Sequence, residues 1–298
     1  MSETPLGGKP MSETPLSETP LLEARGLTKE FTTRGDGAFI AGKRTFVAVD
    51  EVSFVVPARK TLAIVGESGS GKSTTARMAA RLLDITRGSL LFEGEDVSRA
   101  KGAALTSFRS DVQVVFQDPF SSLNPRHTVE KLITAPLVYQ GVKAPQGYTK
   151  LARDLMDRVG LNPDHVQRYP GQFSGGQAQR IGIARALAVN PKLVVCDEAV
   201  SALDVSVQAK VITLLRDLQS ELGLSYIFIA HDLAVVRQIA DRVAVMTQGK
   251  IVEQGDREQI FDNPQHEYTK DLLRAVPTID PEWERRRAEM ILAEELAE

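Results

Sequence analysis

The residues from Gly66 to Ser73 carry the clearest chemical pattern in the sequence. They read GESGSGKS and fit the spacing G-x-x-x-x-G-K-[S/T]. An apolar run over 61–66 predicts a strand before them, and a helix is predicted over 72–83. Glycines in such a turn let backbone N–H groups surround a phosphate, and the helix N-terminus adds the positive end of its dipole. We therefore expect Lys72 to reach the β- and γ-phosphates of a nucleotide and Ser73 to bind Mg²⁺. We refer to residues 66–73 as the phosphate loop.

A pair of acids follows a second apolar run. Residues 193–196 read LVVC and predict a buried strand that ends at Asp197 and Glu198. Ligands of α/β sheets bind at the carboxyl ends of strands, so both carboxylates are expected beside the phosphate loop. There Asp197 can hold Mg²⁺ through a water, and Glu198 can polarise the water that attacks the γ-phosphate. A solvated pair of carboxylates at a strand end is the plain alternative, but the two motifs together predict an NTP-hydrolysing domain.

A third motif, FSGGQ at Phe173–Gln177, precedes a predicted helix over 175–190. Ser174 is suited to cap that helix, because its hydroxyl can accept a hydrogen bond from a free amide of the first turn. The helix would then present a second phosphate-binding N-terminus on the same chain. A capped helix start with two small residues, without any ligand, is the alternative interpretation. We refer to residues 173–177 as the signature segment.

The order of these motifs resembles that of the ATP-binding subunits of ABC transporters. The signature segment is similar to the family's LSGGQ, with Phe in place of Leu. Ser201–Asp204 resembles the family's D-loop, Gln117 its Q-loop and His231 its switch histidine. Phe31 resembles the aromatic residue that stacks on adenine. The resemblance covers about residues 21–275.

The resemblance implies an α/β fold, with a P-loop NTPase core of ABC type. This core has a mainly parallel sheet, an antiparallel β subdomain and a helical subdomain. The implied cofactors are ATP and Mg²⁺. Catalysis is assigned to Glu198, His231 and Gln117, and the metal to Ser73, Gln117 and Asp197. The residues expected to bind ATP are Phe31, Gly66, Glu67, Ser68, Gly69, Ser70, Gly71, Lys72, Ser73, Thr74, Ser174, Gly175, Gly176, Gln177 and Asp204.

Hydrophobic periodicity predicts the elements that position these motifs. Strands are predicted over 47–56 and 225–230, and strands that alternate with helices indicate a mainly parallel sheet. A helix is predicted over 207–222, with one apolar face. That face consists of Val207, Val211, Leu215, Leu218 and Leu222. Turn signals around helical stretches indicate a helical insertion over about 118–190.

Inside this insertion, residues 118–137 are expected to offer an apolar docking surface to a membrane partner. Phe120, Leu123, Leu132 and Ile133 are expected to form it, and the alternative is that they pack inside the insertion. The ends of the chain are expected to differ from the 21–275 domain. Residues 1–20 repeat the unit SETPL and should be disordered, a loop or turn is expected over 33–45, and 276–298 form a tail.

Composition restricts the classes of function. Lys and Arg number 36 against 39 Asp and Glu, a net charge of −3, so nucleic-acid binding gains no support. Cys196 is the single cysteine, which excludes a disulfide framework and a four-thiolate iron–sulfur cluster in this chain. No apolar run approaches the roughly 18 residues of a membrane span, and the N-terminus does not read as a signal peptide. We expect a chain held peripherally at the cytoplasmic face of the cell membrane through partners.

Four longer segments resemble the subfamily that powers import of dipeptides, oligopeptides and sometimes nickel. They are 115–126, 173–208, 231–246 and 263–277. Ala178 and Ala199 depart from the usual Arg and Pro, and the cysteines that often follow the last segment are missing. The implied partners are a second ABC ATPase subunit, which is usually a different homologous chain, two transmembrane permease subunits and, through them, an extracytoplasmic solute-binding protein.

Other interpretations stay open at this level. An exporter ATPase shares the same motifs, and the 263–277 segment is what favours import. A DNA-repair or ribosomal ABC ATPase, and a regulatory domain without hydrolysis, fit less well. The latter is disfavoured because Glu198, His231 and the signature segment are intact. The cargo and the identity of the second subunit stay undetermined.

Overall fold

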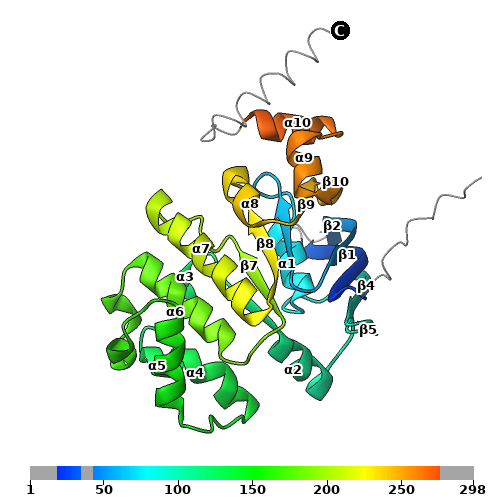
Figure 1. Ribbon diagram of the computed structural model, residues 1–298. Helices are drawn as coiled ribbons and strands as arrows, with labels where there is room; N and C mark the ends of the chain where they lie inside the picture. Colours follow the sequence, from blue (N-terminus) through cyan, green and yellow to red (C-terminus); the bar gives the residue numbers. More distant parts are fainter. Residues whose placement is uncertain (1–18, 35–42, 276–298) are drawn as a thin grey trace, which may run out of the picture.

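The computed structural model describes residues 19–34 and 43–275 (Figure 1). Residues 1–18, 35–42 and 276–298 lie outside the described residues. The tail predicted over 276–298 therefore lies wholly outside them. The disordered segment predicted over 1–20 lies almost wholly outside them, as does most of the loop predicted over 33–45.

A six-stranded sheet forms the centre of the fold, in the order β10-β9-β3-β8-β7-β6. Its strands are β3 (Thr61–Val65), β6 (Val112–Val115), β7 (Leu193–Asp197), β8 (Ser225–Ala230), β9 (Arg242–Thr247) and β10 (Lys250–Asp256). All neighbours pair in parallel except β9 and β10, which are antiparallel. The mainly parallel sheet expected from the sequence is confirmed.

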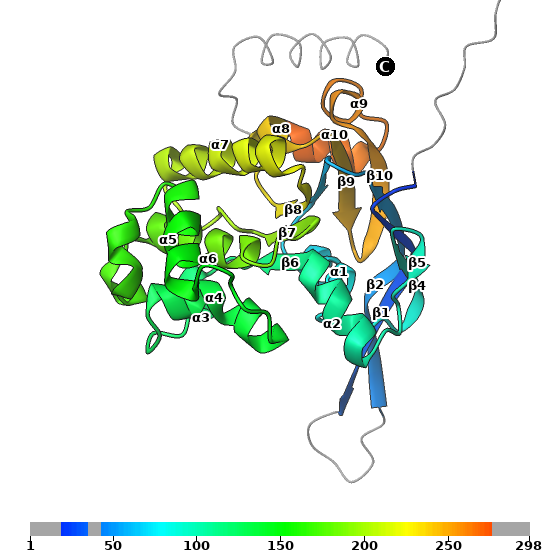
Figure 2. The same cartoon turned by 60° about the horizontal axis from the view of Figure 1, so that its bottom comes forward.

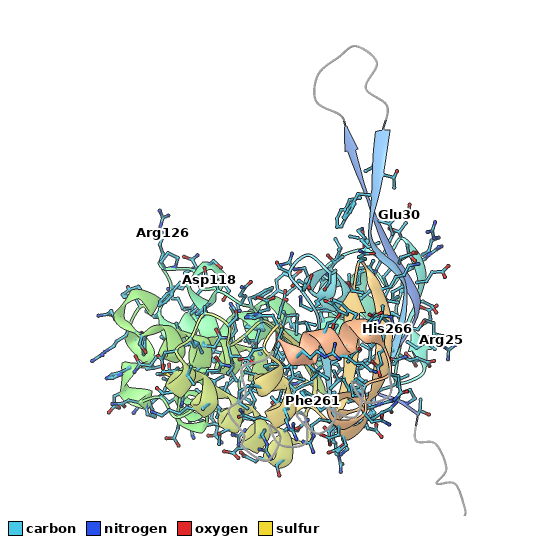
Figure 3. All side chains as sticks on the ribbon, turned by 90° about the horizontal axis from the view of Figure 1, so that it is seen from above. Arg25, Glu30, Asp118, Arg126, Phe261 and His266 are labelled. Atoms are coloured by element: carbon cyan, nitrogen blue, oxygen red, sulfur yellow. The ribbon has the colours of Figure 1, made fainter. Side chains whose placement is uncertain are left out.

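A second, antiparallel sheet lies beside the first, in the order β2-β1-β4-β5. Its strands are β1 (Leu22–Arg34), β2 (Lys43–Val56), β4 (Arg87–Phe92) and β5 (Glu95–Asp96). The long β1–β2 hairpin extends away from the body of the molecule (Figure 2). In the view from above, Glu30 lies on this hairpin, while Asp118 and Arg126 lie on the opposite, helical lobe (Figure 3).

The helical lobe lies between β6 and β7 along the chain. Its elements are α3 (Pro119–Ser122), α4 (Val129–Gln140), α5 (Tyr148–Arg158), the 3₁₀ turns Pro163–Gln167 and Pro170–Gln172, and α6 (Gly175–Leu187). The remaining helices are α1 (Lys72–Ala79), α2 (Gly102–Asp111), α7 (Val205–Leu222), α8 (Leu233–Ile239), α9 (Arg257–Asp262) and α10 (Glu267–Arg274). Figures 1 and 2 show the lobe in green, on the opposite side of the molecule from the antiparallel sheet.

The central sheet separates two hydrophobic cores, because successive side chains of a strand point to opposite faces. On β3, Ala63 and Val65 join the core that includes the helical lobe, α7 and α8. Leu62 and Ile64 of the same strand join the core under α1 and the antiparallel sheet. β3 is thus buried on both faces, as are β7 and β8, which explains their continuous apolar sequences.

Helix α1 is shorter than the predicted range of 72–83, and this part of the prediction is wrong. The helix ends at Ala79 because Arg81 takes a left-handed conformation, with φ of 51°. The amide of Arg81 then bonds Met78 O, and the amide of Leu82 bonds Arg77 O. These two bonds form a Schellman motif, which here ends on an arginine rather than the usual glycine.

Two sets of apolar residues are buried differently from their predictions. On α7, Val211, Leu215 and Leu218 are buried, but Leu222 is 38% exposed because it ends the helix just before Gly223. The predicted apolar face is therefore one residue too long. In the helical lobe the suggested docking residues Leu123, Leu132 and Ile133 are buried in the lobe's own core, so only Phe120 remains exposed.

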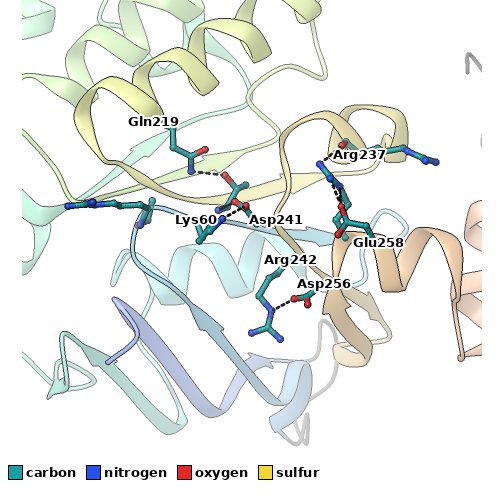
Figure 4. A network of polar contacts seen from close by, with 11 residues as sticks. Lys60, Gln219, Arg237, Asp241, Arg242, Asp256 and Glu258 are labelled. Atoms are coloured by element: carbon teal, nitrogen blue, oxygen red, sulfur yellow. Dashed lines mark hydrogen bonds and ion pairs between the residues drawn. The ribbon is translucent and has the colours of Figure 1, made fainter. Parts of the chain in front are cut away.

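Polar contacts hold the central sheet at the end where β3 begins (Figure 4). Asp241 accepts hydrogen bonds from the Lys60 ammonium and from the Thr61 amide, both at 2.8 Å. Gln219 of α7 donates to the Thr61 hydroxyl at 3.0 Å. The start of β3 is thereby tied to both β9 and α7, so the phosphate loop at the other end of β3 begins from a fixed strand.

Tyr226 provides a test of how α7 is attached to the sheet. Its side chain is buried, and its hydroxyl donates to Leu215 O at 3.0 Å. Tyr226→Phe removes this buried bond and should lower the free energy of unfolding by about 1–2 kcal/mol, measured by urea denaturation. Tyr139→Phe, at an exposed position of α4, is the matched control and should change nothing. Equal stability of Tyr226→Phe and the wild type would contradict this account.

Candidate active site

The backbone of the phosphate loop passes so close to its neighbours that side chains are excluded at two positions. A Cβ on Gly66 would collide with Met246 O, and a Cβ on Gly71 would lie 2.7 Å from Ala48 O. Both glycines also have positive φ, 147° and 102°. Gly71 directly precedes α1 and has no side chain to cap it, so the first amides of α1 remain available to an anion.

Lys72 is the most buried charged group of the loop, with only 4% of the residue exposed. Its ammonium donates to Gly66 O at 2.7 Å and to Glu67 O at 2.6 Å. Burial lowers the pKa of Lys72, and the carboxylates of Glu198, Asp197 and Glu67 oppose that shift. In this conformation the carbonyls of Gly66 and Glu67 accept hydrogen bonds from the Lys72 ammonium. The same N–H groups could instead bind a phosphate.

The expected metal ligands lie together at the ends of β7 and the phosphate loop. The Ser73 hydroxyl donates to Asp197 Oδ1 at 2.7 Å, and Arg77 Nε lies 3.6 Å from Asp197 Oδ2. Asp197 is buried, and Gln117 lines the cleft that also contains Ser73. A hydroxyl, an amide oxygen and a carboxylate are hard oxygen donors of the kind that Mg²⁺ takes together with phosphate oxygens, so the residues present fit the ion.

These groups open into one cleft of about 420 Å³. Its walls come from the β1–β2 hairpin, the phosphate loop, α1 and the ends of β6 and β7. The lining residues are Phe31, Phe46, Ala48, Ser68, Gly69, Gly71, Lys72, Ser73, Thr74, Gln117 and Glu198. The cleft therefore collects most of the phosphate loop together with the predicted aromatic residue and with Gln117 and Glu198, whereas Asp197 and His231 are not among the described residues that line it.

Glu198 connects this cleft to a second, smaller cavity of about 50 Å³. Its amide donates to Ile229 O at 3.2 Å, and its carbonyl accepts from the amide and the hydroxyl of Ser201. Its φ of 50° gives it a left-handed backbone that is unusual for glutamate. His231 and Ser201 line the small cavity, so the predicted switch histidine and the predicted base face the same space.

The other end of the cleft is aromatic. Phe31 of β1 and Phe46 of β2 stand opposite each other in the strand register, 38% and 63% exposed. The Lys29 ammonium lies 5.2 Å from the centre of the Phe31 ring. Phe46 is a residue that the sequence analysis missed, because the strand was predicted to begin at residue 47. The alternation of residues 47–56, extended one residue back and paired with the strand containing Phe31, could have found it.

The signature segment and Asp204 lie elsewhere in the structure: among the described residues that line the cleft, none comes from them. Ser174 caps α6 as predicted. Its hydroxyl accepts from the Gln177 amide at 3.3 Å, while Gln177 Oε1 accepts from the Ser174 amide at 2.9 Å. Gly176 is small for a packing reason, since a Cβ there would collide with Val207 of α7. Asp204 caps α7 by accepting from the Val207 amide, and this bond lowers its pKa.

Three other residues expected to bind ATP do not line the cleft within the described part of the chain. They are Gly66, Glu67 and Ser70. Gly66 and Glu67 direct their carbonyls to Lys72, and the Ser70 side chain is buried beneath the loop. These three residues therefore contribute to the internal structure of the loop. The other phosphate-loop residues and Thr74 line the cleft.

Comparison with known proteins identifies the family. Residues 49–201 match the family described as "ABC transporter", which is about half of the chain. The chain belongs to the ABC transporter family. Residues 252–297 of this ABC protein also match "Oligopeptide/dipeptide transporter, C-terminal region". The family membership and the subfamily resemblance expected from the motifs are confirmed.

Curated relatives agree with this assignment. The chain is 50% identical over 266 residues to a glutathione import ATP-binding protein, GsiA of Salmonella typhimurium. That match covers 89% of this chain and 42% of the relative, so this ABC protein spans less than half the length of GsiA. It is 49% identical over 251 residues to the oligopeptide transport ATP-binding protein OppF of Bacillus subtilis, covering 84% of this chain and 82% of OppF.

Solved structures confirm the fold class. One is the dimeric ATP-binding cassette MJ0796, in a post-hydrolysis state bound to ADP and Pi. It matches this chain with a TM-score of 0.68 and 26% sequence identity, and the match covers 79% of this chain and 98% of the MJ0796 chain. CbiO1 from Clostridium perfringens, part of the cbiONQ ABC transporter complex, has a TM-score of 0.69 and 25% identity, covering 83% and 92%.

Phe46 allows a direct test of the aromatic end of the cleft in this ABC protein. Phe46→Ala should weaken nucleotide binding about three- to tenfold, since stacking between aromatic rings contributes roughly 0.5–1.5 kcal/mol. The dissociation constant for ATP with Mg²⁺ can be measured by calorimetry. Val47→Ala is the matched control, because the neighbouring Val47 is also exposed but does not line the cleft. An unchanged affinity of Phe46→Ala would remove Phe46 from the nucleotide site.

Proposed function

We propose that this chain binds ATP with Mg²⁺ and hydrolyses it to power an ABC importer of peptides. One observation carries the proposal: a single cleft brings Lys72, Ser73 and Glu198 together with an aromatic end at Phe31, in a chain with an oligopeptide/dipeptide transporter C-terminal region. The relatives GsiA and OppF, which are named for import of glutathione and transport of oligopeptides, support the substrate class.

The geometry supports a division of labour along the cleft. Phe31 and Phe46 receive the adenine, while the triphosphate lies along the phosphate loop at the N-terminus of α1. Lys72 exchanges the carbonyls of Gly66 and Glu67 for the β- and γ-phosphates. Ser73, Gln117 and Asp197 would hold Mg²⁺, which would neutralise charge that develops on the phosphates.

Glu198 is the proposed general base. Its carboxylate accepts a proton from the attacking water as the water oxygen bonds the γ-phosphorus and the bond to the β,γ-bridging oxygen breaks, which leaves ADP and phosphate. The anchored backbone of Glu198 keeps its side chain at the boundary between the cleft and the small cavity. His231, which lines that cavity, is placed to sense whether the γ-phosphate is present.

A second ATPase subunit completes the proposed site. The signature segment and Asp204 lie away from this chain's own cleft, and the solved neighbour MJ0796 is dimeric. We propose a head-to-tail pair with a homologous chain, in which Ser174 and the N-terminus of α6 face the ATP bound to the partner. The γ-phosphate then holds the two chains together until hydrolysis removes it.

Attachment to the membrane is proposed to run through permease partners. Within residues 19–34 and 43–275, no helix has the length and apolar character needed to cross a bilayer. Two permease subunits and, through them, a solute-binding protein are the proposed further partners, with this chain on the cytoplasmic face. Phe120, still exposed at the start of the helical lobe and three residues after Gln117, is the apolar residue best placed to meet a permease.

The role of Glu198 can be tested in the assembled transporter. Glu198→Gln keeps the size of the side chain but cannot accept the proton, so turnover should fall about 10²- to 10⁴-fold while ATP binding is retained. Release of phosphate and binding of ATP are the two measurements. Glu95→Gln, exposed on β5, is the control and should behave as the wild type. Near-normal turnover in Glu198→Gln would show that another group is the base.

The position of Ser174 can be tested by following each ATP site separately in a complex with the second ATPase subunit. Ser174→Arg should block closure and lower nucleotide occupancy at the partner's phosphate loop, because a bulky cation replaces the cap of α6. Binding at this chain's own Lys72 should persist, and Ser220→Arg on the exposed side of α7 should alter neither site. Loss confined to this chain's own site would exclude the head-to-tail arrangement.

A further inference from the structure

A hydrogen bond joins the C-terminal region to the phosphate loop. The amide of Glu67 donates to the hydroxyl of Tyr268 at 3.2 Å, between residues 201 positions apart. Tyr268 lies in the first turn of α10 and is half-buried against the core on the helical-lobe side of the sheet. None of the roles derived above uses this residue, although it belongs to the segment whose sequence resembles the peptide-importer subfamily.

Both the carbonyl and the amide of Glu67 are hydrogen-bonded. Its carbonyl accepts from the Lys72 ammonium at 2.6 Å and from the Ser70 amide at 3.2 Å, while its own amide is used by Tyr268. Lys72 is the group that must leave this carbonyl to reach a phosphate. The Tyr268 bond does not compete with that movement, because it engages the amide on the other side of Glu67 and lies outside the cleft.

Tyr268 is itself held in place by α10. The Glu253 carboxylate of β10 accepts from the amides of Gln265 and His266, at 2.7 and 3.0 Å, and so fixes the chain just before the helix. His266 (Figure 3) then caps α10 by accepting from the Tyr268 amide at its Nδ1. Further along the helix, Leu273 is buried in the core. Because α10 holds Tyr268 in place, the Tyr268 hydroxyl can fix the orientation of the phosphate loop.

We propose that Tyr268 is a positioning residue for the phosphate loop, through which the C-terminal region sets the affinity for ATP. The inference rests on the proposed function, because it assumes that the loop receives the phosphates. The Tyr268 bond keeps the Glu67 backbone in place when Lys72 moves from its carbonyl to the nucleotide. Without the bond, the exposed Glu67 amide turns to water at little cost, and the loop must be ordered again with each binding event.

The test is Tyr268→Phe in the full-length chain, which removes only the hydroxyl. In the nucleotide-free protein, amide hydrogen exchange across the phosphate loop should become faster. In the assembled transporter the KM for ATP should rise about two- to fivefold, the lower part of the range for one lost hydrogen bond, with kcat unchanged. Tyr148→Phe is the matched control, because its hydroxyl also makes one hydrogen bond to the backbone, donating to Val142 O, but in the helical lobe.

A second variant acts on the anchor rather than on the hydroxyl. Glu253→Gln weakens the attachment of α10 and should shift exchange and KM in the same direction, to a smaller extent. Unchanged exchange and KM in Tyr268→Phe would overturn the proposal, as would a fall in kcat with KM constant. Because the exchange measurement needs no nucleotide, a wild-type chain that failed to bind ATP would refute the proposed function while the Tyr268 contact was still tested.

Discussion

The fold is organised around one buried cation. The Lys72 ammonium is almost entirely removed from water, and its charge must be balanced by oxygen atoms that the rest of the structure supplies. The carbonyls of Gly66 and Glu67 contact it directly, and the carboxylates of Asp197 and Glu198 stabilise its charge from the end of β7. In the proposed function a triphosphate replaces the carbonyls as the counter-charge, so the same constraint that shapes the loop prepares it for this ligand.

Sheet order supplies those oxygen atoms from distant parts of the sequence. β8 lies between β3 and β7, and all three run in the same direction, so the phosphate loop, Glu198 and His231 all follow strands at one edge of the sheet. The contact between Ser73 and Asp197 spans 124 positions in sequence and depends on this arrangement. The two apolar cores pack against both faces of these strands and bury them.

Parts of the chain outside the cleft connect to it in two different ways. The signature segment begins a helix in the other lobe, and among the described residues none of it lines this chain's cleft, which is why we propose that it serves a partner. The C-terminal region, in contrast, reaches the back of the phosphate loop through Tyr268. In the proposed dimer the nucleotide faces a second subunit on one side, and on the other side α10 contacts the phosphate loop through Tyr268.

The sequence alone determined the local chemistry of this protein. The phosphate loop, the paired acids after β7 and the cap at Ser174 are set by residues a few positions apart, and the apolar runs over 61–66 and 225–230 fixed two central strands. What it could not supply depends on residues far apart. Phe46 joins the cleft only through its pairing with Phe31, and Tyr268 meets Glu67 only because α10 packs near the loop. Burial of Leu132 and exposure of Leu222 depend on what neighbouring helices cover, and a periodic pattern does not encode the position of those neighbours.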